Sequence, residues 1–156
     1  MNVGALDTGR DPRVLAGFMI LIVAIMMALS YSVPAQCPQW DVRRIYSINQ
    51  SNNIVVKLDT LNQRGPRISG TASFRNKAGL QNGTIAGSMV GDEFKVEIKW
   101  AYGETGVYSA KRVEETAGRN KLSYLVGEAY IKEQPNNKSR FTTWKSSNSL
   151  VCYQGR

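Results

Sequence analysis

The sequence predicts an all-β protein: an eight-stranded antiparallel up-and-down β-barrel, preceded by an N-terminal signal peptide or membrane-spanning helix. Hydrophobic and polar residues alternate along residues 93–100, as in a strand with one buried face. Turn-forming residues recur at short intervals after residue 36, and no helix-length amphipathic segment separates them. Closure into a barrel removes both unpaired sheet edges, whereas the alternative, an open β-sandwich, needs longer crossover connections.

The N-terminal segment has the pattern of a secretory signal. Residues 14–29 are almost wholly apolar, and Arg10 and Arg13 precede them. Small side chains stand at Val33 and Ala35, the two positions that a signal peptidase reads. We therefore expect cleavage after Ala35.

Residues 1–35 form the predicted signal peptide, and residues 36–156 form a single β-barrel domain of ordinary size. The signal segment contacts the membrane only transiently in this interpretation. The alternative is an uncleaved anchor in the inner membrane through residues 14–33, because about 20 apolar residues span a bilayer. The barrel is exported in both cases, and we expect it to be secreted or periplasmic when the signal is cleaved.

Eight strands are expected, and each is bounded by turn-forming residues. They are Trp40–Ile48, Ile54–Leu58, Arg67–Phe74, Gly83–Gly91, Glu93–Trp100, Val107–Glu115, Lys121–Lys132 and Ser139–Ser147. The glycines inside these runs are Gly70, Gly83, Gly87 and Gly127. Glycine within a strand permits the sharp bends that a small closed barrel requires.

The two cysteines, Cys37 and Cys152, flank all eight expected strands. A pair so placed in an exported domain predicts a disulfide that holds the first and last segments side by side. Free thiols or a metal pair are the competing interpretation. It is weak because the chain contains no histidine to complete a metal site.

The formal net charge of +8 favours anionic neighbours. The basic residues are scattered, however, and no glycine-rich or aromatic RNA-binding signature accompanies them. We expect a solvated surface and no specific nucleic-acid partner.

Few residues support catalysis. The chain has no histidine, no Gly-x-Ser-x-Gly sequence and no phosphate-binding glycine loop. Glu128 shares a strand face with Tyr130, and it is either a buried polar anchor, a partner for Arg112, or a hydrated residue of the outer face. We expect no enzyme activity, no cofactor and no metal.

Five short segments resemble strands of the avidin and streptavidin family, in order and at similar spacing. They are Ile68–Thr71, Val96–Trp100, Val107–Ala110, Glu128–Ile131 and Thr143–Ser146. The resemblance covers roughly residues 54–147 and implies an eight-stranded barrel of the calycin type. Trp40 is similar to the tryptophan that seals the base of such barrels.

The family's strand-end aromatic residues wall a biotin pocket, so the resemblance implies ligand-binding roles for Trp100, Tyr108, Tyr130 and Trp144. The alternative is that these four side chains only fill the core. The family's polar biotin ligands correspond here to Ala72, Phe74, Glu104 and Gly106. A site that lacks those hydrogen-bond partners loses its ligand, so high-affinity biotin binding is not implied.

Two classes of function remain. The first is a barrel that binds a small apolar or aromatic molecule at its mouth. The second is a protein-binding barrel, such as a hydrolase inhibitor, that acts through expected long loops at 74–83 and 132–140. Either class is compatible with a homo-oligomer.

Overall fold

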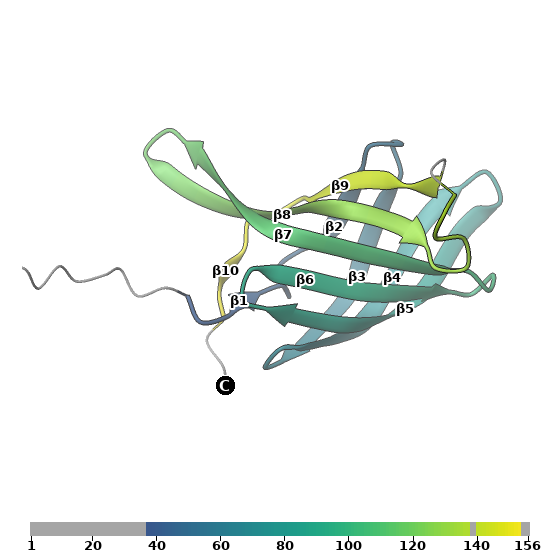
Figure 1. The fold of residues 1–156 in the computed structure, drawn as a ribbon, viewed down its shortest axis with the longest axis horizontal. Helices are drawn as coiled ribbons and strands as arrows, with labels where there is room; N and C mark the ends of the chain where they lie inside the picture. The colour runs from purple at the N-terminus through teal and green to yellow at the C-terminus, as the bar shows by residue number, and fades with distance from the viewer. Residues whose placement is uncertain (1–36, 138–139, 154–156) are drawn as a thin grey trace, which may run out of the picture. The chain divides into compact units, whose positions relative to one another are not determined.

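The computed structural model describes residues 37–137 and 140–153, and it contains a closed antiparallel barrel (Figure 1). Each of its eight strands pairs with the next along the chain, and the last returns to pair with the first. The predicted all-β, eight-stranded, up-and-down barrel is confirmed. The predicted signal peptide at 1–35 lies outside the described residues. Within the described ranges, no helix is long and apolar enough to cross a membrane.

Four barrel strands, at residues 55–64, 67–76, 79–90 and 105–117, are longer than the sequence indicated, and most connections are tighter, whereas the first and last barrel strands are shorter than expected. The strands are β2 (Ser47–Gln50), β3 (Val55–Arg64), β4 (Arg67–Asn76), β5 (Gly79–Val90), β6 (Glu93–Trp100), β7 (Thr105–Ala117), β8 (Asn120–Ile131) and β9 (Thr142–Ser146). The expected long loop at 74–83 is wrong, because β4 and β5 pair up to Asn76 and Gly79 and only Lys77 and Ala78 connect them. The connection from β8 to β9 is long, as predicted.

The first predicted strand, Trp40–Ile48, is wrong as a single element. It divides into β1 (Trp40–Asp41) and β2, and the chain turns between them. Strand β1 pairs with β10 (Val151–Cys152) in a separate two-stranded sheet. The barrel therefore begins only at Ser47.

A disulfide joins Cys37 to Cys152, as predicted, with their Cα atoms 5.5 Å apart. The bridge lies beside the β1–β10 ladder, in which Trp40 faces Cys152. It spans a sequence separation of 115 residues and so ties together the two ends of the described chain. Such a disulfide is consistent with an oxidising compartment, extracellular or periplasmic.

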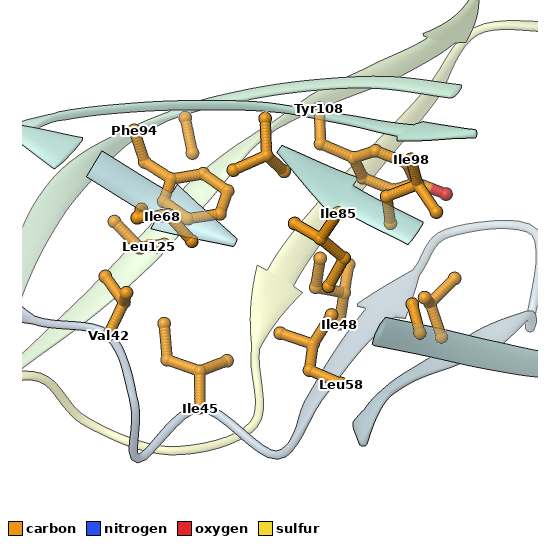
Figure 2. Packing of buried hydrophobic residues seen from close by; sticks show 14 of the residues in the cluster. Val42, Ile45, Ile48, Leu58, Ile68, Ile85, Phe94, Ile98, Tyr108 and Leu125 are labelled. Atoms are coloured by element: carbon orange, nitrogen blue, oxygen red, sulfur yellow. The ribbon is translucent and has the colours of Figure 1, made fainter. Parts of the chain in front are cut away.

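Apolar side chains from every barrel strand pack against one another in the barrel interior (Figure 2). Strand β6 shows the alternation that the sequence predicted, with Phe94, Val96, Ile98 and Trp100 buried. Ile48, Ile68 and Leu125 reach the same cluster from other strands, although they lie far apart in the sequence. Closing the sheet on itself thus gives each strand's apolar face a partner, which is the main stabilising term.

The segment after β1 closes one end of the barrel, which we call the base. Val42 and Ile45 are fully buried there, with 0% and 2% of their surfaces exposed. The buried amide of Gln63 donates to Trp40 O at 2.8 Å and accepts from Val42 N at 2.9 Å, which fixes this segment against β3. Backbone groups buried near a barrel end need such partners.

Trp40 is half-buried and packs against the apolar core at the base. Its indole nitrogen donates to Asp92 Oδ1 at 2.9 Å, and the guanidinium of Arg112 lies 4.6 Å from its ring centroid. Asp92 also accepts from Arg112 Nε at 2.8 Å, and this bond holds the pKa of the Asp92 carboxyl below its usual value. The base is therefore covered by Val42 and Ile45, with Trp40 at its margin.

Reducing the disulfide should lower stability without dissolving the barrel strands. A closed loop of this length contributes about 4 to 5 kcal/mol on the chain-entropy estimate. Urea unfolding with and without a reductant measures the effect, and the double variant Cys37→Ser/Cys152→Ser is the control that should not respond to the reductant. Equal transition midpoints in both conditions would contradict the prediction.

Gly70 lies where β4 passes close to β3, and its replacement should be costly. A Cβ at Gly70 would stand 1.8 Å from Thr60 O, a backbone atom that cannot rotate away. We expect Gly70→Ala to reduce the unfolding free energy by at least about 2 kcal/mol. The neighbouring exposed substitution Ser69→Ala should change it by less than about 0.5 kcal/mol. Similar urea midpoints for the two variants would refute the close approach.

Candidate functional site

A cavity of about 290 Å³ lies at the end of the barrel opposite the base, which we call the mouth. Strands β2, β4, β6 and β8 end there, and β3, β7 and β9 begin there. Six aromatic side chains contribute to its lining: Phe74, Trp100, Tyr102, Tyr108, Tyr130 and Phe141. A concave site at a barrel mouth that combines several aromatic side chains with a few polar ones is typical of small-ligand binding.

The position of Trp100 follows from the alternation along β6. It is the last residue of that strand, it faces inward, and only 3% of its surface is exposed. Gly83 stands opposite it on β5, and a Cβ there would lie 2.7 Å from Trp100 Cε3. The glycine therefore allows the indole to lie directly against the β5 backbone.

Phe74 and Tyr102 pack around Trp100 at the mouth. The Phe74 ring meets the indole edge to face with centroids 4.7 Å apart, and the Tyr102 ring is stacked with it at 6.5 Å. Edge-to-face and offset-stacked arrangements are the favourable ones for aromatic rings. Tyr102 is 47% exposed, so the cluster continues from the barrel interior to the solvent.

Tyr108 forms a deep part of the cavity wall. It faces inward from β7, and 4% of its surface is exposed. Its hydroxyl oxygen, the one polar atom that Figure 2 draws among these side chains, accepts a hydrogen bond from Gln50 Nε2 at 3.2 Å. Burial raises the pKa of Tyr108 well above its ordinary value, although the Gln50 bond opposes the shift.

An ion pair lies at the rim of the cavity. Arg140 Nη1 donates to both carboxylate oxygens of Glu104, at 3.1 and 3.2 Å. Burial, followed by the negative charge of Glu104, raises the pKa of the neighbouring Tyr102. These two charged side chains neutralise one another, so the described lining carries no net charge.

Three of the four predicted ligand-binding residues, Trp100, Tyr108 and Tyr130, lie on this cavity. Trp144 is not among its lining residues. Its ring packs against Phe94 and Tyr108 with centroids 5.8 and 6.3 Å away, and its indole nitrogen donates to a backbone oxygen, Glu128 O, at 3.0 Å. Trp144 thus belongs to the core beside the cavity.

Tyr130 lies at the edge of the site rather than deep inside it. It alternates along β8 with the buried Ala129, so its ring leaves the strand on the outer side. It stacks on Phe141 with centroids 5.3 Å apart, and Phe141 is 42% exposed. Glu128 is exposed on the same outer face, which agrees with its predicted hydrated alternative.

Arg112 does not pair with Glu128, since it donates to Asp92 and to Ser123 near the base. Sequence reasoning also missed Tyr102, which follows β6 and so lies outside the strand alternation. It missed Phe141 as well, because alternation along the expected strand Ser139–Ser147 puts Phe141 on the face opposite Trp144. Phe74, which the resemblance to avidins marks only as a position where a polar biotin-binding residue is missing, is part of the cavity wall.

A hollow elsewhere on the described chain has a different lining. It measures about 680 Å³, lies over β3, β4 and β5 beside Arg64 and Arg67, and has no aromatic side chain among its lining residues. Within residues 37–137 and 140–153, no three acidic, histidine or cysteine side chains gather as metal ligands would.

No protein-family model, curated protein or solved structure matches this chain. The fold establishes an eight-stranded antiparallel barrel, an architecture that unrelated functions share. The mouth and its side chains are therefore the features of this chain that bear on function.

Alkaline pH should destabilise the barrel through Tyr108. The folded state holds the Tyr108 proton more tightly than the unfolded state does, so the unfolding free energy should fall as pH rises above about 10. Urea unfolding across this range should show a smaller loss for Tyr108→Phe than for the unsubstituted protein. Tyr46→Phe, at a site 65% exposed, should keep the full loss. An equal loss in all three proteins would contradict the assignment.

Proposed function

We propose that this protein is an exported, non-enzymatic β-barrel binding protein that holds a small apolar or aromatic molecule at the barrel mouth. The observation that carries the proposal is the cavity of about 290 Å³ between Phe74, Trp100, Tyr102 and Tyr108. An eight-stranded barrel is just wide enough to be filled by its own side chains or to retain room for one small ligand. The base of this barrel is filled, whereas space remains at the mouth.

Biotin is not the ligand that this lining favours. Phe74 and Gly106 line the cavity and carry no side-chain hydrogen-bonding group, and Ala72 is buried without one. Each missing bond to a buried polar group costs about 1 to 3 kcal/mol, so we expect weak biotin binding. The avidin-like relationship is supported only by short sequence motifs and stays a prediction.

Export is supported by the Cys37–Cys152 bridge and by the signal-like pattern of residues 1–35. Disulfides persist in oxidising compartments, so we propose a secreted or periplasmic location. Anchoring to the inner membrane through residues 14–33 is the alternative for the same pattern.

The alternative function is a protein-binding barrel such as a hydrolase inhibitor. The hairpin of β7 and β8 supports it. Strand β7 pairs with β6 only up to Lys111, and β8 pairs with β9 only from Val126 onward, so the rest of the hairpin projects beyond its neighbouring strands (Figure 1). Val113 and Val126 are 41% and 38% exposed on this hairpin. The same exposed apolar side chains are compatible with a homo-oligomer.

A fluorescence titration tests the small-molecule proposal. Apolar and aromatic compounds that enter the mouth should change tryptophan emission saturably, because Trp100 lines the cavity. The change should be lost in Trp100→Phe and retained in Trp40→Phe, whose tryptophan lies at the base. Unchanged emission across the whole compound set, together with retention of an envelope protein on the immobilised barrel, would favour the protein-binding alternative. A nanomolar dissociation constant for biotin would contradict the ligand class proposed here.

A further inference from the structure

The indole nitrogen of Trp100 differs from those of the other two tryptophans. Trp40 Nε1 donates to Asp92, and Trp144 Nε1 donates to Glu128 O. In the described part of the chain, Trp100 Nε1 has no acceptor. Every side-chain nitrogen or oxygen that is buried in that part has a hydrogen-bond partner. Since Trp100 Nε1 has none, it is not fully buried, and it reaches the open space of the cavity that its ring lines.

Tyr108 supplies a second donor to the same space. Its hydroxyl oxygen accepts from Gln50 Nε2, which occupies one lone pair and leaves the hydroxyl proton for another acceptor. None of the residues that the structure describes accepts that proton. A hydroxyl on a side chain only 4% exposed therefore has its donor capacity available to whatever fills the cavity.

Both donors lie beside Gly106. The position that a Cβ on Gly106 would take lies 3.2 Å from Trp100 Nε1 and 3.5 Å from Tyr108 Oη. Because glycine has no side chain, no Cβ separates these two donors from the cavity that all three residues line. An acceptor atom of a ligand in the cavity beside Gly106 can therefore approach both donors.

The surroundings favour an uncharged acceptor. The only charged side chains of the described lining, Glu104 and Arg140, are paired with each other at the rim. An ion placed beside Tyr108 would have no free counter-ion and would lose its hydration. A carbonyl oxygen, which is neutral and has two lone pairs, suits two converging donors better than a carboxylate does.

We propose that the mouth binds a neutral, ring-bearing molecule through a carbonyl oxygen that accepts hydrogen bonds from Trp100 Nε1 and Tyr108 Oη. This inference rests on the proposed small-molecule function and specifies its ligand class. The rings of Phe74, Trp100 and Tyr102 contact the apolar body, and the two donors select the oxygen.

The test compares indane, indanone and indane carboxylate, three probes with the same ring body. We expect indanone to bind at least about tenfold more tightly than indane, because two hydrogen bonds are added. Indane carboxylate should bind more weakly than indanone, since its charge is desolvated at the site. Calorimetric or NMR titration of the disulfide-bonded protein measures the three affinities.

The chain contains three tryptophans, so their indole N–H signals report the contact directly. Indanone should shift the Trp100 signal downfield, while indane should not, and the signals of Trp40 and Trp144 should stay in place because their nitrogens are already bonded. Assignment follows from the three single Trp→Phe variants.

Variants separate the two donors from general packing. The double variant Tyr108→Phe/Gln50→Leu removes the Tyr108 hydroxyl together with the Gln50 amide, which would otherwise lose its hydrogen-bond partner and become a new donor in the cavity. This variant should reduce the indanone-to-indane affinity ratio about fivefold. Tyr46→Phe should leave the ratio unchanged. Gly106→Ala should weaken both probes, because its Cβ stands 2.8 Å from Tyr108 Cε2 and occupies the point beside the donors.

The outcomes distinguish the two proposals. Binding of indane and indanone with equal affinity, or an unmoved Trp100 signal, would overturn the carbonyl contact while leaving the small-molecule function in place. Binding of none of the three probes would overturn both. Tighter binding of indane carboxylate than of indanone would overturn the assignment of a neutral ligand.

Discussion

The pairing of β2 with β9 is the contact on which the mouth depends, because it closes the sheet. Ile48 faces Ser146 and Gln50 faces Trp144 across this ladder, although nearly the whole barrel separates them in sequence. Ser146 is buried in the same region, and its hydroxyl accepts from Leu125 N at 3.1 Å. Closure leaves no unpaired barrel edge, and it also brings the Gln50 amide within reach of Tyr108 Oη. An open sheet would have an apolar face but no enclosed cavity.

The two ends of the barrel differ in the residues that cover them. The segment after β1 carries Val42 and Ile45 over the base, and Gln63 and the disulfide hold that segment in place. At the mouth, aromatic side chains near the ends of β4 and β6 and in the turn after β6 pack against one another and line the cavity without filling it. Packing thus stabilises the base, while the mouth keeps a cavity and two available hydrogen-bond donors.

Residue alternation was a sufficient guide where strands are regular. It placed Trp100 on the inner face, and the positions of the two cysteines were enough to predict their bridge. The same reasoning failed at strand ends. Nothing in the sequence separates Trp40 from the strand that begins at Ser47, because the chain turns between them through contacts with distant residues such as Gln63. Boundaries of this kind depend on long-range pairing rather than on local propensity.

The sequence by itself determined the fold class and the strand order, because period-two alternation and turn residues are local signals that a closed sheet satisfies in one way. It also determined the disulfide, because the chain has two cysteines and they flank all the strands. Only the tertiary structure decided which aromatic residues border empty space. Trp100 and Trp144 both face inward, yet one lines the cavity and the other is packed against Phe94. The difference comes from neighbours on other strands. Gly83 lets the Trp100 indole lie against β5, and Gly106 has no side chain to fill the cavity beside that indole. Which residue faces a given ring is known only once the strand register is set.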